Sequence, residues 1–161
     1  MQWGKHNIAE SNKDQKQGDA AVNDPATGAP IGYVPAMSAE TVRSAIGTAH
    51  DSFAGWSATV PQERSRILRR LSQLIAEHAE DLAHLLTAEQ GKPLAEARAE
   101  IGSAAGYFEF FSEEARRLNG EIIASPRADS RLLVTHRPIG VVGAITPWNF
   151  PASMVARKLA P

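Results

Sequence analysis

The sequence predicts an α/β fold in which long amphipathic helices precede a hairpin and one strand of the buried type. Apolar residues recur every three or four positions through most of residues 37–119, which is the period of a helix that buries one face. The period changes to two in residues 120–137, as expected of strands. Residues 139–145 then carry no polar side chain, a pattern typical of a strand covered on both faces in a parallel sheet.

The composition is that of an ordinary globular domain. The chain has 161 residues, of which 43% are hydrophobic and 22% charged, and its formal net charge is -1. This charge gives no electrostatic case for a nucleic-acid partner or an anionic membrane. No apolar stretch approaches the roughly 20 residues that span a bilayer, and the polar start without an apolar signal region favours a cytoplasmic location.

The chain contains no cysteine. Disulfides, thiolate metal sites and a cysteine nucleophile are therefore excluded within these residues.

Residues 1–36 are expected to form a polar lead-in that ends in a turn and a short extended segment. The lead-in covers about residues 1–20. A type I turn is then expected at Asn23-Asp24-Pro25-Ala26-Thr27-Gly28, because Pro25 suits the first corner position and Gly28 closes the turn. Residues 31–35 are expected to be extended.

Two helices are expected before Gly91. Ser38 is the predicted N-cap of the first, with Glu40 in its first turn. The second is predicted to begin near Pro61, a residue tolerated in a first turn, and to run as one helix of roughly 40 Å. His78 falls on its apolar face and is expected to be a core or interface residue.

A third helix is predicted from Pro93 to Asn119-Gly120, which supply its start and stop signals. Gly102 and Gly106 lie inside it and suggest close approach by another backbone, because each lowers helix propensity by about 1 kcal/mol. Its apolar stripe is Leu94, Ala97, Ile101, Ala104, Phe108, Phe111, Ala115 and Leu118.

The last part of the chain is expected to hold a hairpin, a buried strand and a loop. Residues 121–124 and 132–136 are the predicted hairpin strands, and residues 139–145 the buried strand. Pro147 and Pro151 frame a loop, after which a helix is expected to start. Too few residues follow for sibling strands, so the chain is expected to stop partway through a domain.

The segment Arg137-Pro138-Ile139-Gly140-Val141-Val142-Gly143-Ala144-Ile145-Thr146-Pro147-Trp148-Asn149-Phe150-Pro151 resembles the signature of the aldehyde dehydrogenase superfamily. The resemblance covers about residues 21–161 and includes the turn motif at residues 24–28, the pair Glu63-Arg64 and the segment Thr87-Ala88-Glu89-Gln90-Gly91-Lys92-Pro93. This last segment and Arg157-Lys158-Leu159-Ala160-Pro161 are most similar to the succinate-semialdehyde dehydrogenase branch.

The resemblance implies the amino-terminal part of an enzyme that oxidises a small aldehyde to its carboxylate with NAD or NADP. Residues 37–119 and 138–161 would belong to an incomplete Rossmann-like cofactor domain, and residues 120–137 to the oligomerisation element of a homodimer or homotetramer. The family's cysteine nucleophile and glutamate base would lie beyond Pro161, so this chain alone is expected to be inactive.

The resemblance assigns Asn149 as the donor to the oxyanion, a catalytic role suited to an amide that donates without losing a proton. The alternative is a turn asparagine that bonds its own backbone. Ile145, Thr146, Pro147, Trp148 and Asn149 would line the nicotinamide side of the cofactor site. For Trp148, core packing is the other interpretation.

Arg157 is the predicted substrate-binding residue, since relatives that act on ω-carboxy aldehydes have arginine there and a guanidinium binds a carboxylate in two-pronged fashion. A solvated arginine on a helix surface is the alternative. Lys158 matches a lysine frequent near the family's active site and is a further catalytic candidate.

Other chemistries find no support in the sequence. It contains no Gly-x-Gly-x-x-Gly fingerprint and no Gly-x-Ser-x-Gly elbow, and its five histidines show no metal-ligand spacing. Two further hypotheses stay open: a non-catalytic helical interaction module, and a nonfunctional truncated product.

Overall fold

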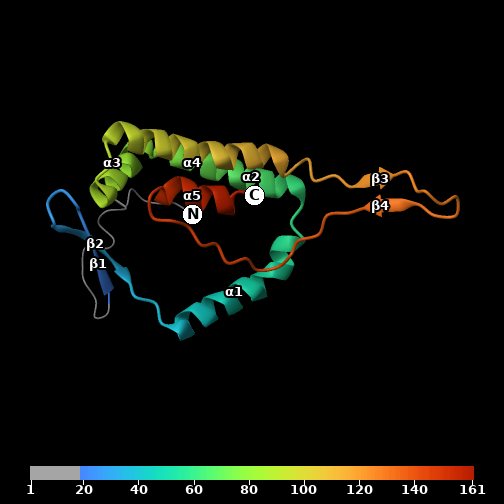
Figure 1. The fold of residues 1–161 in the computed structure, drawn as a ribbon, viewed down its shortest axis with the longest axis horizontal. Helices are drawn as coiled ribbons and strands as arrows, with labels where there is room; N and C mark the ends of the chain where they lie inside the picture. Colours follow the sequence, from blue (N-terminus) through green and yellow to red (C-terminus); the bar gives the residue numbers. More distant parts are fainter. Residues whose placement is uncertain (1–18) are drawn as a thin grey trace.

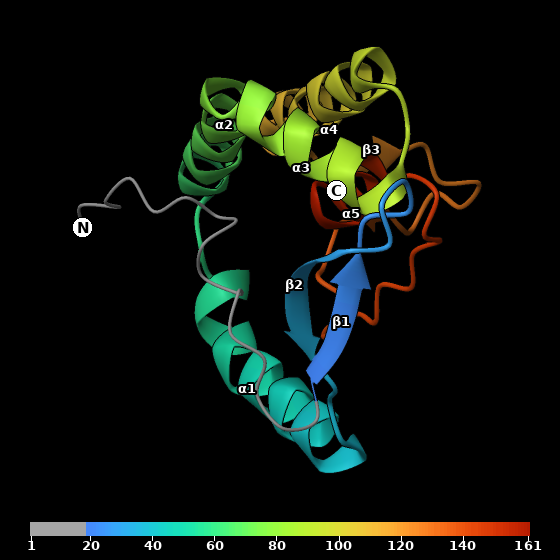
Figure 2. The same cartoon turned by 90° about the vertical axis from the view of Figure 1, so that its left-hand side faces the viewer.

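A computed structural model describes residues 19–161 as a helical body with a hairpin projecting from one end (Figure 1). Residues 1–18 of the predicted lead-in lie outside the described residues, and its last two residues begin β1 (Asp19–Asn23). Helices α2, α4 and α5 lie side by side in this body, α3 covers one end, and α1 lies apart from them, as Figure 2 also shows. None of the described helices is long and apolar enough to cross a membrane.

A first hairpin, which the sequence predicted only in part, contains β1 (Asp19–Asn23) and β2 (Pro30–Pro35). The predicted turn joins these strands. The Asp24 carboxylate accepts the N–H of Ala26 at 2.7 Å, and the N–H of Gly28 donates to the Asp24 carbonyl at 2.7 Å. Gly28 has a φ of 73°, a conformation that glycine adopts without steric cost.

The predicted cap of α1 (Ala39–Ser57) is confirmed, since the Ser38 hydroxyl accepts the N–H of Thr41 at 3.1 Å. The helix has no buried residue. Its apolar residues Val42 and Ile46 are 45% and 55% exposed, so this face of the helix is only partly covered within residues 19–161.

The predicted single second helix is wrong. Two helices, α2 (Pro61–Glu77) and α3 (Ala79–Gln90), meet at His78, whose φ of -107° and ψ of 18° interrupt the helical path. His78 is exposed, so it is not a core residue of the described part, and its alternative position at an interface stays a prediction. The break redirects α3 so that Ala83 and Leu86 are buried against α4.

The core lies where α4 (Leu94–Glu114) meets α2, α3 and α5 (Pro151–Leu159). Most of the stripe predicted for the third helix faces this core. The helix ends at Glu114 instead of Asn119, and Leu118 beyond its end is 60% exposed. The buried apolar residues are Ala83, Leu86, Ala97, Ile101, Ala104, Phe108, Ala156 and Ala160. α5 therefore depends on α4 for its packing.

The backbone approach expected at Gly102 and Gly106 is not seen within residues 19–161. Both glycines are exposed, and a Cβ at either position would meet nothing within 4 Å among the described residues outside its own helix.

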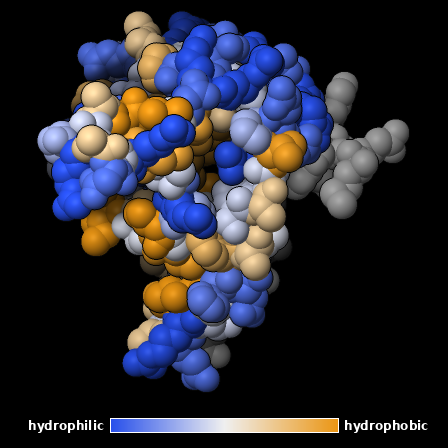
Figure 3. All heavy atoms as spheres, turned by 90° about the vertical axis from the view of Figure 1, so that its right-hand side faces the viewer, coloured by the Kyte–Doolittle hydropathy of each residue, from blue (hydrophilic) through white to orange (hydrophobic). Residues whose placement is uncertain are grey.

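The predicted second hairpin is confirmed as β3 (Glu121–Ile123) and β4 (Leu132–Val134), in which Glu121 pairs with Val134. It has only these two strands, and Ile122 is 84% exposed. Figure 3, viewed from the hairpin side, shows apolar residues open at the surface.

Residues 139–145 do not form the predicted strand. Ile139 and Ile145 are 92% and 91% exposed, and no residue of this run pairs with another strand. A strand needs backbone partners from other segments, and among residues 19–161 no strand pairs with this run.

Candidate functional site

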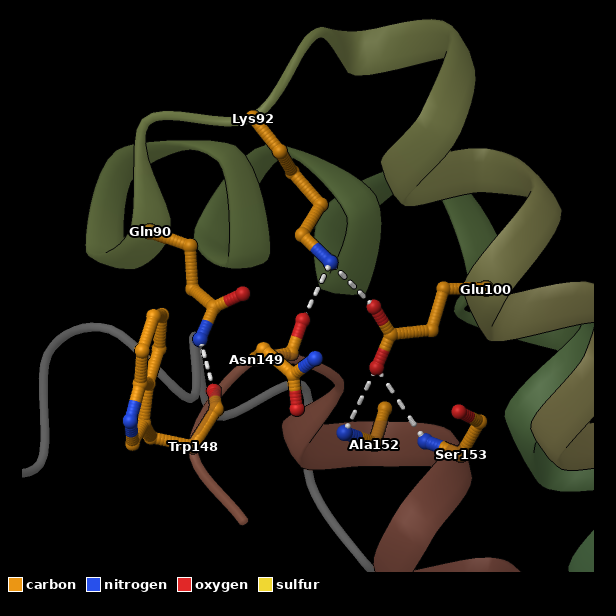
Figure 4. Close-up of polar contacts among 7 residues, drawn as sticks. All are labelled: Gln90, Lys92, Glu100, Trp148, Asn149, Ala152 and Ser153. Carbon is orange, nitrogen blue, oxygen red and sulfur yellow. Dashed lines mark hydrogen bonds and ion pairs between the residues drawn. The ribbon is translucent and has the colours of Figure 1, made fainter.

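A short loop, residues 147–150, carries Trp148 and Asn149 and leads into the start of α5 (Figure 4). Residues before proline are restricted to extended conformations, and Phe150 before Pro151 has a φ of -140° and a ψ of 68°. Pro151 then begins the helix at a position where its missing N–H costs nothing. The two prolines thus define both ends of the loop.

Two side chains, one at the end of α3 and one in the short segment before α4, hold the main chain of this loop. The Gln90 side-chain amide donates to the carbonyl oxygen of Trp148. The Lys92 ammonium donates to the carbonyl oxygen of Asn149 at 3.1 Å. Lys92 Nζ also lies 4.4 Å from the ring centroid of Phe150, a favourable cation–π distance.

Glu100 joins this arrangement from inside the body. It is 5% exposed, and its Oε2 lies 2.5 Å from Lys92 Nζ. Its Oε1 accepts the N–H groups of Ala152 at 2.9 Å and Ser153 at 3.2 Å. α5 has no side-chain cap of its own. Glu100 therefore caps α5 from α4, with its negative charge at the positive end of the helix dipole.

The turn of the first hairpin reaches the same region. Gly91, between Gln90 and Lys92, has a φ of 72° and ends α3, with its N–H donating to the Thr87 carbonyl at 2.7 Å. A Cβ on Gly91 would lie 2.8 Å from Cγ of Pro25. The turn motif and the segment at residues 87–93 therefore meet in space.

The structure leaves the predicted loop residues open to solvent. Asn149 is exposed, and its side-chain amide has no hydrogen-bond partner within residues 19–161. The turn-asparagine alternative, which needs such a bond to its own backbone, is therefore not observed. Trp148 is 83% exposed, so core packing does not explain it. Ile145 and Pro147 are also exposed, and Thr146 is half-buried.

Arg157 and Lys158 lie at the opposite end of α5 from the loop. Both are exposed and occupy the last turn, where positive charge complements the helix dipole. At 1.5 Å per residue, Arg157 is about 9 Å along the helix from Pro151.

Sequence reasoning missed the individual roles of Gln90, Lys92 and Glu100. One signal was available for Glu100. It follows Ala97 by three positions and precedes Ala104 by four, which places a carboxylate on the buried face of a helix. A buried carboxylate needs a partner, and Lys92 provides it.

An exposed ion pair between α3 and α4 gives a useful contrast. Arg98 donates to Glu80 at 2.9 Å, with side chains 49% and 63% exposed. The hydrogen bonds from Arg98 lower the pKa of Glu80. No group of acidic residues and histidines within residues 19–161 has the geometry of a metal site.

The sequence matches the pattern of the Aldehyde dehydrogenase family over residues 12–161. The chain belongs to this family, and the predicted resemblance is confirmed. It is 49% identical over 149 residues to succinate-semialdehyde dehydrogenase (NADP⁺) of Escherichia coli, covering 92% of this chain and 31% of that protein. Its identity to 3-sulfolactaldehyde dehydrogenase of Pseudomonas putida is 50% over 141 residues, covering 88% and 29%.

Solved structures show the same fold. The succinate-semialdehyde dehydrogenase from Burkholderia pseudomallei superposes with a TM-score of 0.85 at 48% identity, covering 88% of this chain and 30% of that one. A betaine aldehyde dehydrogenase from Staphylococcus aureus in complex with NAD⁺ gives 0.84 at 31% identity, covering 92% and 30%. The chain therefore has the aldehyde dehydrogenase fold over the part described, and it spans about 30% of the length of these relatives.

Proposed function

We propose that this chain is the amino-terminal part of an NAD(P)-dependent aldehyde dehydrogenase that oxidises an aldehyde bearing a second, anionic group. Succinate semialdehyde is the first substrate to test. The observation that carries the proposal is the exposed Asn149 carboxamide, presented on a loop whose main chain is held by buried and half-buried side chains.

Asn149 would stabilise the negative charge that forms on the aldehyde oxygen during attack by a nucleophile. Its amide has two N–H donors, and no residue within 19–161 occupies them. A donor of fixed position is effective because it needs no reorganisation when the charge develops. The amide also cannot lose its proton to the oxyanion.

The residues before Asn149 would contact the nicotinamide ring of the dinucleotide. Ile145 and Trp148 are 91% and 83% exposed, which leaves apolar surface and main-chain atoms available to contact the nicotinamide. When bound, NAD(P)⁺ would accept the hydride from the substrate. Ile145, Thr146, Pro147 and Trp148 would orient the ring and exclude water from one side of it.

Arg157 would bind the second, anionic group of the substrate. Its guanidinium is exposed and close in sequence to the loop, and guanidinium groups bind carboxylates through paired hydrogen bonds. Support comes from the relatives' names. Succinate semialdehyde, glutarate semialdehyde and 3-sulfolactaldehyde each combine an aldehyde with a carboxylate or a sulfonate.

The test is Asn149→Ala in the full-length enzyme that contains this segment. Loss of one oxyanion donor should lower kcat by about 10²–10³-fold, because only the transition state uses this hydrogen bond. Asn119→Ala is the matched control, since Asn119 is an exposed asparagine outside the loop. Equal rates for the wild type and Asn149→Ala would refute the assignment, provided that calorimetry shows unchanged cofactor binding.

A further inference from the structure

We infer that Gln90, Lys92 and Glu100 are positioning residues of the reaction: together they form a backbone clamp that fixes where the Asn149 amide points. This inference rests on the proposed function. The clamp contacts the main chain on both sides of the Asn149 side chain, as Figure 4 shows.

The contacts of the clamp hold the backbone at four points, two in the loop and two in the first turn of α5. Gln90 binds the carbonyl of Trp148, and Lys92 binds the carbonyl of Asn149. Glu100 binds the N–H groups at the start of α5. When the peptide groups before and after a residue are both held, the direction of its Cα–Cβ bond is set. The clamp thereby aims the Asn149 side chain without touching it.

Stability alone does not account for the Lys92–Glu100 pair. Its side chains are 12% and 2% exposed, and burying two charges costs desolvation energy that their attraction often fails to recover. The neighbouring pair Arg98–Glu80 already links α3 with α4 at the surface. The feature that distinguishes the buried pair is that Lys92 and Glu100 each have a second contact, to the loop or to α5.

The shape of the clamp also explains why charged groups occur here. The Lys92 ammonium has three donors and no acceptor, and it uses them between the Glu100 carboxylate and the Asn149 carbonyl oxygen. Charge-assisted hydrogen bonds are shorter and stronger than neutral ones. A charged pair therefore restrains the loop more tightly than a neutral pair would.

The test uses the double variant Lys92→Met/Glu100→Gln in the full-length enzyme, beside each single variant. Lys92→Met alone leaves a buried carboxylate without its counter-charge and should lower the melting temperature. The double variant removes both charges, and the new amide oxygen can still accept the N–H groups of Ala152 and Ser153. Its melting temperature should return toward that of the wild type.

The kinetics of the double variant separate positioning from stability. Its kcat should stay about 10- to 100-fold below that of the wild type, because a misplacement of about 1 Å can cost 10²-fold in rate. The KM for the aldehyde should change less than about threefold, since ground-state binding does not use the clamp. Glu80→Gln, which removes the exposed pair, should leave kcat unchanged.

Recovery of kcat together with the melting temperature would overturn the inference, because the pair would then be structural only. If the double variant does not fold, Gln90→Leu decides, since it removes only the donation to the Trp148 carbonyl. It should lower kcat with little change in melting temperature, and an unchanged kcat would overturn the inference.

The Asn149→Ala result tells apart failure of the clamp from failure of the proposed function. A rate loss in Asn149→Ala without one in the clamp variants rejects the clamp alone. No rate loss in Asn149→Ala rejects both.

Discussion

Replacement of Gly91 by alanine should open the junction between α3 and α4. Gly91 has a φ of 72°, and a Cβ there would lie 2.8 Å from Cγ of Pro25. The left-handed conformation costs a residue with a side chain about 1–2 kcal/mol, and overpacking against a neighbour typically adds about 1–3 kcal/mol. The expected loss of local stability is therefore about 2–5 kcal/mol.

Hydrogen exchange of the full-length enzyme measures this loss directly, because amides exchange through local opening. A loss of about 2 kcal/mol or more should raise the opening constant of peptides spanning residues 85–97 by about 30-fold or more. Gly28→Ala is the matched control. Gly28 has a φ of 73°, but a Cβ there would meet nothing within 4 Å, so it carries only the conformational cost.

A double-mutant cycle with Pro25→Ala isolates the steric contribution. Removing the ring should relieve part of the cost of Gly91→Ala and none of the cost of Gly28→Ala. Equal losses for the two glycine variants, or no relief by Pro25→Ala, would refute the contact as the cause.

Four further outcomes are expected. Arg157→Ala should lower kcat/KM for succinate semialdehyde by about 10- to 100-fold, from the loss of charged hydrogen bonds, and should affect an uncharged aldehyde of similar length much less; equal losses would remove Arg157 from substrate binding. Gly120→Ala should lower the melting temperature, because the added Cβ would clash with the Val134 carbonyl oxygen. An unchanged melting temperature would mean that the hairpin backbone shifts at no cost to accommodate the methyl group. Because the pKa of Glu80 is lowered in the folded state, its pair with Arg98 stabilises the fold fully above the ordinary carboxyl pKa. This stabilisation is lost as the pH falls through the lowered pKa. The melting temperature of Glu80→Gln should therefore fall less on acidification than that of the wild type. Finally, the purified 161-residue chain should not reduce NAD(P)⁺ with any aldehyde, and turnover would contradict this expectation. The same chain should self-associate in sedimentation velocity through its exposed apolar residues, and a stable monomer would contradict that.

Local signals in the sequence predicted the elements whose determinants are local. The Ser38 cap, the Pro61 start and the Gly91 stop each act within one helical turn, and all three were found where predicted. The break at His78 has no such signal, because neither glycine nor proline lies there and the next helix begins at once. Packing of α3 against α4 accompanies this bend.

The run at residues 139–145 failed as a strand prediction for a different reason. The apolar composition of this run indicates only that a strand formed from it would be stable when buried on both faces. Whether it pairs depends on segments distant in sequence, and within residues 19–161 it has no paired neighbour.

In the candidate site, too, the sequence predicted the local features and missed the long-range contacts. The motif at residues 137–151 located Asn149 and Trp148 on the loop. The contacts that hold the loop span 52 to 58 positions of sequence, beyond the reach of any local pattern. Only Glu100, a carboxylate among the apolar positions of a helix, offered a sequence signal for such a contact, and the sequence analysis missed it.

The loop at residues 147–150 is supported through its peptide groups, whereas its own exposed side chains carry none of the anchoring hydrogen bonds. The scaffold therefore places few demands on which amino acids stand at positions 148 and 149, between Pro147 and Phe150. Positions 148 and 149 are consequently suited to saturation mutagenesis, in which the side chains vary while the backbone of the loop keeps its conformation.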